Sequence, residues 1–247
     1  MRAPFRHRDF RALVAGLAIS QTGDWLYNVA LLVFVLRATH SASWVAAAGI
    51  VRLLPYVLFG TLGGVIADRF PRKRVMIASD LARAVLMGVL AIVAAAGGAP
   101  ILAILLSGVS TTFAVAYGPC VNAAMPVIVD EGELSAANSI ASTIQNVCIA
   151  LGPAVGGVLL VLGSAAWAFA FNALTFCGSA IAVAMIRSDL GPATIAVRRA
   201  APRRDRRDPR VERGRGARRR VDGERVPVRD GDRVTRARRD AAVGYRR

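Results

Sequence analysis

Six long apolar runs dominate the first three-quarters of this 247-residue chain. A helix needs about 20 mostly apolar residues to cross the hydrocarbon core of a bilayer, and each run is long enough. A helix of a soluble protein would keep one polar face, whereas the third and sixth runs are apolar all round. We therefore predict an all-α membrane protein, a bundle of six transmembrane helices at residues 12–36, 44–67, 75–97, 101–125, 137–162 and 165–187.

The distribution of Lys and Arg predicts how these helices are oriented. Two groups of cations lie on one side of the membrane: Arg2, Arg6, Arg8 and Arg11 before the first run, and Arg69, Arg72, Lys73 and Arg74 between the second and third. The loops on the other side contain only Arg37. Cations next to spanning segments stay in the cytoplasm. We predict a multi-pass protein of the cell (plasma or inner) membrane with both termini in the cytoplasm.

Several motifs carry a family resemblance. The turn Gly64-Val-Ile-Ala-Asp68-Arg69-Phe-Pro-Arg72-Lys73-Arg74 resembles the G-x-x-x-D-R-x-x-R-[KR]-[KR] signature of the major facilitator superfamily, with Pro71 in place of the usual glycine. The stretch Asn138–Gln145 and the sequence Gly152-Pro153-Ala-Val-Gly156-Gly157 resemble the exporter branch that contains siderophore (enterobactin) and macrolide efflux proteins. The resemblance implies the N-terminal six-helix half of a transporter.

The resemblance also implies roles for residues. It places Gly64, Asp68, Arg69, Arg72, Lys73 and Arg74 in a latch that closes the cytoplasmic side. The helix-five motif of Gly152, Pro153, Gly156 and Gly157 is associated with export; small residues also let helices approach closely, and proline loosens the helix. The implied function is secondary active efflux of a small, largely apolar molecule, such as a drug, macrolide or siderophore, without a cofactor.

Ionisable side chains inside a membrane span are expensive and therefore functional candidates. Asp24 and Arg52 are such residues, and Asp24 lies on a polar stripe with Gln21 and Asn28. The two charges lie at similar depths if the first two helices are antiparallel, so we predict an Asp24–Arg52 pair that gates transport or couples it to protons. A static pair, or an arginine that extends to the interface, is the alternative.

The fifth run repeats this polar pattern. Our candidates for transport or coupling are Asp24, Arg52, Gln21, Asn28, Gln145 and Asn146. Such side chains either line a solute cavity or only form hydrogen bonds between helices, and the sequence leaves both interpretations open.

No set of residues predicts catalysis. His7 and His40 lie outside the runs, on opposite sides of the membrane, and Cys120, Cys148 and Cys177 are scattered without metal-ligand spacing. We therefore predict neither a catalytic residue nor a metal site, and we expect that the protein is not an enzyme.

Residues 188–247 differ from the rest: the chain from residue 187 onward contains 21 of the 32 Lys and Arg residues. This composition predicts a disordered, Arg-rich cytoplasmic tail. Three origins are open: a frame change in GC-rich coding sequence, a segment that binds anionic lipid, or a nucleic-acid-binding segment, which its single aromatic residue, Tyr245, disfavours.

One bundle is half of what alternating access requires. The chain is therefore expected to be truncated, and its expected partners are membrane lipid, a small-molecule substrate, and either a second six-helix half or a second copy. The alternative function is a non-transporting membrane anchor whose basic tail binds anionic lipid or nucleic acid.

Overall fold

The computed structural model describes residues 3–191, apart from the side chains of residues 159 and 162, so the tail lies outside the described residues. The elements within this range are all helical: η1 (Ala3–Arg6), α1 (Arg8–Thr39), α2 (Ala42–Arg69), α3 (Arg72–Ala95), α4 (Pro100–Ala114), α5 (Tyr117–Ile128), η2 (Glu131–Glu133), α6 (Leu134–Leu162) and α7 (Ala165–Ala184). Six segments are long and apolar enough to span a membrane, with α4 and α5 together forming the fourth. The predicted all-α architecture with six spans is confirmed.

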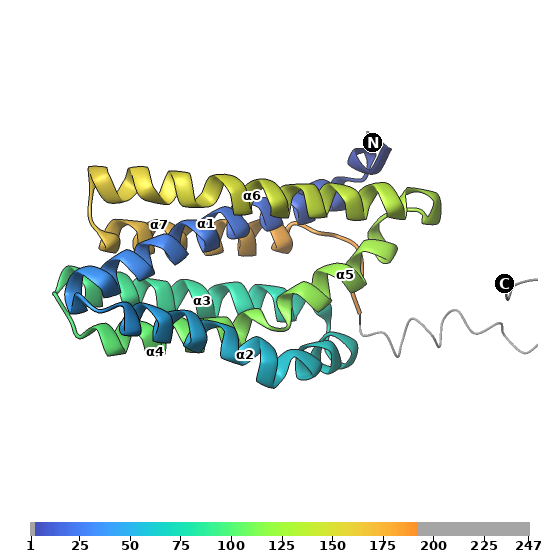
Figure 1. Ribbon diagram of the computed structural model, residues 1–247. Coiled ribbons are helices and arrows are strands. Elements are labelled where there is room, and N and C mark those ends of the chain that lie inside the picture. Colours follow the sequence, from blue (N-terminus) through green and yellow to red (C-terminus); the bar gives the residue numbers. More distant parts are fainter. Residues whose placement is uncertain (1–2, 192–247) are drawn as a thin grey trace, which may run out of the picture. The chain divides into compact units, whose positions relative to one another are not determined.

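The helices are arranged in two groups (Figure 1). In one group α1 packs on α6 and α7, and in the other α4 packs on α2 and α3. The extensive contact between α3 and α7 joins the two groups. The turns between consecutive spans are short; the turn between α3 and α4 uses Gly97 at φ +68°, a backbone conformation that glycine adopts without steric penalty.

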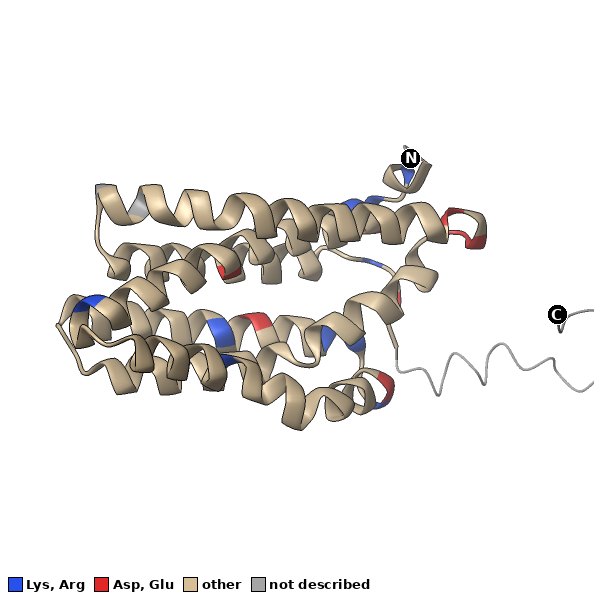
Figure 2. Ribbon diagram, in the orientation of Figure 1, with Lys and Arg blue, Asp and Glu red and all other residues tan. Residues whose placement is uncertain are grey.

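Charged residues lie mainly at the end of the bundle that carries the N-terminus (Figure 2). Element η1, the acidic turn 130–133 and the turn between α2 and α3 are all at this end, whereas the last turn of α1, which contains Arg37, is at the opposite end (Figure 1). A few charged positions remain in the middle of the helices (Figure 2). These central charges are the exception in an otherwise apolar bundle.

The interior consists of two apolar clusters with a polar layer between them. Along α1, residues 10–17 belong to one cluster and residues 26–35 to the other. Several buried polar side chains lie at the height between the clusters, among them Ser20 on α1, Asp80 and Arg83 on α3, and Ser179 on α7. The same order of apolar, polar and apolar side chains therefore occurs on three helices at the middle of the bundle.

The spans differ in how far the bundle encloses them. In the most apolar window of α2, and in that of the span containing α6, 17% of residues are buried, against 39–50% in the other four spans. The exposed face of α2 carries large apolar side chains, including Leu53, Val57 and Leu62. These two helices are therefore the least covered by the rest of the chain.

Candidate functional site

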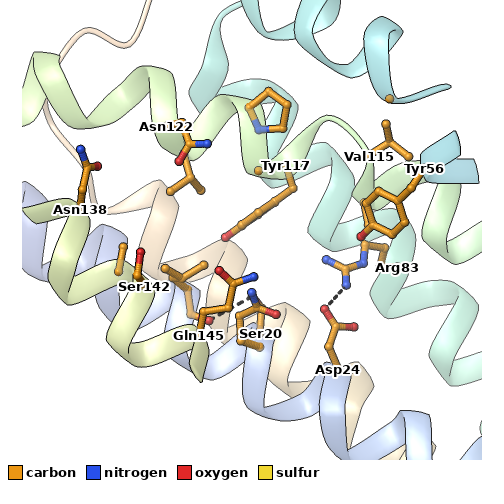
Figure 3. A pocket seen from close by; sticks show the side chains of 18 residues that line it. Ser20, Asp24, Tyr56, Arg83, Val115, Tyr117, Asn122, Asn138, Ser142 and Gln145 are labelled. Carbon is orange, nitrogen blue, oxygen red and sulfur yellow. Dashed lines mark hydrogen bonds and ion pairs between the residues drawn. The ribbon is translucent and has the colours of Figure 1, made fainter. Parts of the chain in front are cut away.

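A cavity of about 710 Å³ opens beside the polar layer. Its walls come from α1, α2, α3, α5 and α6 and from the connection between α4 and α5. Figure 3 shows Asn138, Ser142 and Gln145 of α6 on one side, with Tyr117 and Asn122 of α5 and Ser20 and Asp24 of α1 around the same space. Leu17, Pro119 and Val121 add apolar surface. The cavity thus offers both hydrogen-bonding groups and apolar contacts within the membrane-spanning part of the chain.

The break in the fourth span forms one wall of this cavity. Pro119 has no N–H, so it cannot bond the carbonyl oxygen of Val115 four residues earlier, and the helix is interrupted between α4 and α5. A Cβ on Gly63 of α2 would lie only 2.6 Å from that same oxygen. We predicted one continuous helix over 101–125, so this break is a correction. Irregular backbone at membrane depth is tolerated where it lines a cavity, as Val115 does here.

An ion pair crosses the cavity wall. Arg83 of α3 donates a hydrogen bond to the Asp24 carboxylate of α1 (Figure 3). The guanidinium carbon of Arg83 lies 3.9 Å from the centroid of the Phe176 ring, which fixes the arginine against α7. Arg83 Nη1 is 3.8 Å from the Asp80 carboxylate on its own helix. One guanidinium therefore faces two carboxylates.

The predicted Asp24–Arg52 pair does not form. Asp24 is paired with Arg83, and the Arg52 guanidinium carbon instead lies 4.8 Å from the centroid of the Tyr27 ring. Our prediction compared the depths of the two side chains and did not include the rotation of each helix about its axis. Arg83 was missed as a cavity residue, although an arginine inside the third apolar run, one turn after Asp80, was a usable signal.

The other candidate residues divide into two groups. Gln21 and Gln145 line the cavity with Asp24, whereas Arg52, Asn28 and Asn146 are not among its lining residues. Asn146 follows Gln145 on α6 and is exposed, but it does not line the cavity. Tyr56 and Asn122 line the cavity as well, and sequence reasoning did not single them out. Asn122 had a usable signal, because it is a lone amide in the apolar run of the fourth span.

Comparison with known proteins identifies the family of this chain. Residues 1–199 match the family described as transmembrane secretion effector, in the major facilitator superfamily. The chain belongs to this family. Its members are transporters rather than enzymes, so the resemblance to major facilitator exporters is confirmed.

Three relatives of this chain are named as efflux or transport proteins. Macrolide efflux protein A of Streptococcus pyogenes is 29% identical over 182 residues, covering 72% of this chain and 44% of the relative. The uncharacterized MFS-type transporter YfiS of Bacillus subtilis is 30% identical over 185 residues, covering 74% and 43%. The staphyloferrin A transporter of Staphylococcus aureus is 26% identical over 156 residues, covering 62% and 39%. The chain spans about half the length of the curated relatives it matches.

Hydrogen bonds join the turn between α2 and α3 to the segment after α7. The buried Arg72 donates its backbone N–H to the carbonyl of Leu190 at 2.9 Å, and Lys73 Nζ donates to the carbonyl of Ile186 at 2.6 Å. The side chains of Asp68, Arg69 and Arg74 are exposed. A Cβ on Gly64 would meet nothing within 4 Å, so its small size is not used inside the described bundle.

The glycines of the export-associated motif pack on α1. A Cβ on Gly152 would lie 2.3 Å from Trp25 Cβ, and one on Gly156 would lie 3.0 Å from the Leu26 carbonyl oxygen. Pro153 is inside α6, and Gly157 has open space around it. Two of the four residues thus allow close contact between α6 and α1, which together carry a large share of the cavity lining.

A second ion cluster lies near the N-terminal end of the bundle. Arg6 pairs with Glu133 and lies 3.9 Å from the Asp130 carboxylate, and His7 Nε2 is 3.0 Å from Glu133 Oε2. His7, Asp130 and Glu133 are close enough together to hold a metal ion, but the Arg6 guanidinium already occupies the Glu133 carboxylate. Ion pairing explains this arrangement, which joins the start of the chain to the connection between α5 and α6.

Proposed function

We propose that the chain forms one six-helix bundle of a secondary active exporter and that the cavity at the polar layer holds the exported solute. The observation that carries this proposal is the lining of that cavity. Its amide and hydroxyl groups and the Asp24–Arg83 pair lie at mid-depth in an apolar bundle. Polar groups inside a membrane bundle mark solute and ion pathways. The break in the fourth span supports the same position, because discontinuous helices form the substrate sites of many transporters.

The mixture of side chains favours a small solute that is largely apolar but has several hydrogen-bonding groups. The volume of about 710 Å³ is in the usual range of ligand pockets, roughly 300–1,000 Å³. Macrolides and staphyloferrin A are the solutes that appear in the names of relatives. We therefore propose a drug, macrolide or siderophore as the class of substrate.

We place the protein in the cell membrane with its N-terminus and the segment after α7 in the cytoplasm. The concentration of Lys and Arg at that end of the bundle supports this orientation. It puts the turn of Asp68 and Arg72 on the cytoplasmic side, where we propose that it acts in closing the exporter. A cysteine introduced at the exposed Phe70 tests this, because it should react with a membrane-impermeant maleimide only after cells are permeabilised.

We propose that a second six-helix bundle covers α2 and α6, the two least enclosed spans. Alternating access requires two bundles that move against each other around the solute. The second bundle is either a further copy of this chain or a separate half. Mass measurement of the purified chain in detergent distinguishes a dimer from a monomer, and a monomer that exports no solute until a second half is co-expressed supports the latter.

A transport assay on cavity residues tests the function. In cells that express the chain together with its second bundle, Asn138→Ala and Gln145→Ala should lower macrolide efflux severalfold because each removes a cavity hydrogen-bonding group. Thr143→Val is the matched control, since Thr143 is exposed on the same helix and bonds only the Ser139 carbonyl. If a panel of macrolides and siderophores is not exported in any arrangement, the non-transporting anchor becomes the better interpretation.

A further inference from the structure

We infer that Asp80 binds the proton that couples this exporter, and that Arg83 moves between Asp24 and Asp80 as the proton leaves and returns. The inference rests on the proposed function and names the coupling ion and its residue. It follows from three features of the polar layer: the burial of Asp80, the balance of charges around it, and a chain of hydroxyl groups that leads from it to the cavity.

Asp80 is buried without compensation. Its exposed fraction is 0%, and neither carboxylate oxygen makes a hydrogen bond of normal geometry with the residues that the structure describes, although the Ser179 hydroxyl lies beside it. Arg83 Nη1, the cationic atom beside it, lies 3.8 Å from Asp80 Oδ1, which is too far for a hydrogen bond. A buried ionised carboxylate without such partners is strongly unfavourable in a low-dielectric interior. A bound proton removes that penalty.

The balance of charges leads to the same conclusion. The titratable groups that face Asp80 are Arg83 of its own helix, Asp24 of α1 and Tyr117 of α5, while α7 contributes the Ser179 hydroxyl. Arg83 is already paired with Asp24, so the single guanidinium cannot neutralise both carboxylates. Two carboxylates that share one cation in a buried site retain one proton between them. Asp24 is 18% exposed and Asp80 is fully buried, which assigns the proton to Asp80.

A path for the proton is present. The Ser179 hydroxyl lies beside Asp80, and it shares a hydrogen bond of 3.1 Å with the Tyr117 hydroxyl. Tyr117 in turn lines the cavity (Figure 3). Hydroxyl groups both donate and accept hydrogen bonds, so this pair can pass a proton between the buried carboxyl and water in the cavity.

The movement of Arg83 and the release of the Asp80 proton occur together. When Arg83 turns from Asp24 to Asp80, the O–H bond of the Asp80 carboxyl breaks, its electron pair stays on the carboxylate, and the proton passes through Ser179 and Tyr117 to cavity water. Asp24 is then free in the wall of the cavity, where solute or water contacts it. Reprotonation of Asp80 returns Arg83 to Asp24, so that proton binding and the state of the solute cavity change together.

Infrared difference spectroscopy of the full chain in detergent tests the proton site without requiring transport. At neutral pH, where an exposed Asp with a pKa of about 4 is ionised, the wild type should show the carbonyl band of a protonated carboxyl. Asp80→Asn should remove the band, and Asp130→Asn, at an exposed acid, should leave it. Asp80→Glu should restore a shifted band. A wild type without the band, or an Asp80→Asn chain that keeps it, overturns the inference.

Transport in vesicles that contain the chain together with its second bundle tests the coupling. Asp80→Asn should lower efflux driven by a pH gradient at least tenfold and leave solute exchange without a gradient within about twofold, and Asp80→Glu should regain part of the driven efflux. Equal loss of both activities would mean that Asp80 is only structural. Absence of all transport in the wild type would refute the proposed function, whereas the infrared result would still decide whether Asp80 holds a proton.

Discussion

The glycines of α6 and those of α2 follow the same small-residue spacing, but they have different surroundings. Gly152 and Gly156 lie against α1, where an added Cβ would be 2.3 Å and 3.0 Å from the nearest atoms. Gly60 and Gly64, also four residues apart, have nothing within 4 Å of such a Cβ. Small residues at this spacing permit two helices to approach, but the spacing does not specify the partner.

This difference separates two uses of one motif. In α6 the glycines serve packing within the bundle and bring the cavity-lining side chains of α6 close to those of α1. In α2 they lie on a helix that the rest of the chain hardly covers. We therefore expect alanine at these positions to have effects of opposite sign on the stability of the purified chain.

Gly152→Ala is expected to cause the largest loss of stability. The new methyl group would overlap Trp25 Cβ, an atom next to the backbone that cannot move away by a change of rotamer. Overpacking of this kind costs about 3 kcal/mol when the helices must move apart. The measurement is the free energy of unfolding in mixed micelles. Gly157→Ala, on the same helix with open space around it, is the control, and equal effects at both positions would refute the close packing of α6 on α1.

Gly63→Ala should cause the second-largest loss of stability, lowering the free energy of unfolding by about 2 kcal/mol. Gly63 differs from its α2 neighbours because the added Cβ would approach the Val115 carbonyl oxygen to 2.6 Å, at the break in the fourth span. The substitution should also push α2 away from the cavity wall and weaken solute binding. Unfolding and binding of a fluorescent macrolide are both measured, with Gly49→Ala, at an open position of the same helix outside the cavity lining, as the control. A stability unchanged by Gly63→Ala would contradict the contact.

The sequence predicted the spans well because the length of an apolar run directly reflects the thickness of the hydrocarbon core. Helix α3, for example, was expected at 75–97 and lies at Arg72–Ala95. The break at Val115 was not predicted, although Pro119 was visible. A proline in a membrane helix removes a hydrogen bond and crowds the carbonyl four residues earlier. Whether the helix then bends or breaks depends on neighbours such as Gly63, and these are known only from the packing.

The sequence predicted only part of the polar lining of the cavity, because it shows the depth of a side chain but not the helix that the side chain faces. The stripe that contains Gln21 and Asp24 faces the cavity, as the cost of polar groups in lipid requires. The partner of Asp24 was wrong because the choice between Arg52 and Arg83 depends on helix rotation and on the long reach of an arginine side chain. Membrane length determines depth in the bilayer, but contacts with neighbouring helices determine which way a side chain points.

A smaller effect is expected for Gly156→Ala, at about 1 kcal/mol of destabilisation. Its added Cβ would be 3.0 Å from the Leu26 carbonyl oxygen and 3.4 Å from Val29 Cβ, so a shift of a few tenths of an ångström relieves the contact. Chemical unfolding of this variant beside Gly152→Ala gives a graded series on one interface. If Gly156→Ala destabilises more than Gly152→Ala, then α6 packs on α1 with a different register.

The smallest effect, of opposite sign, is expected for Gly64→Ala. Alanine is favoured over glycine inside a helix by roughly 0.5–1 kcal/mol, and the position is open, so the isolated chain should become about 0.5 kcal/mol more stable. If a second bundle packs closely on α2, as we propose, the same methyl group should weaken that association severalfold. Unfolding of the chain alone and its association in detergent are therefore measured together. A more stable chain whose association is unchanged would mean that lipid, rather than a second bundle, covers this part of α2.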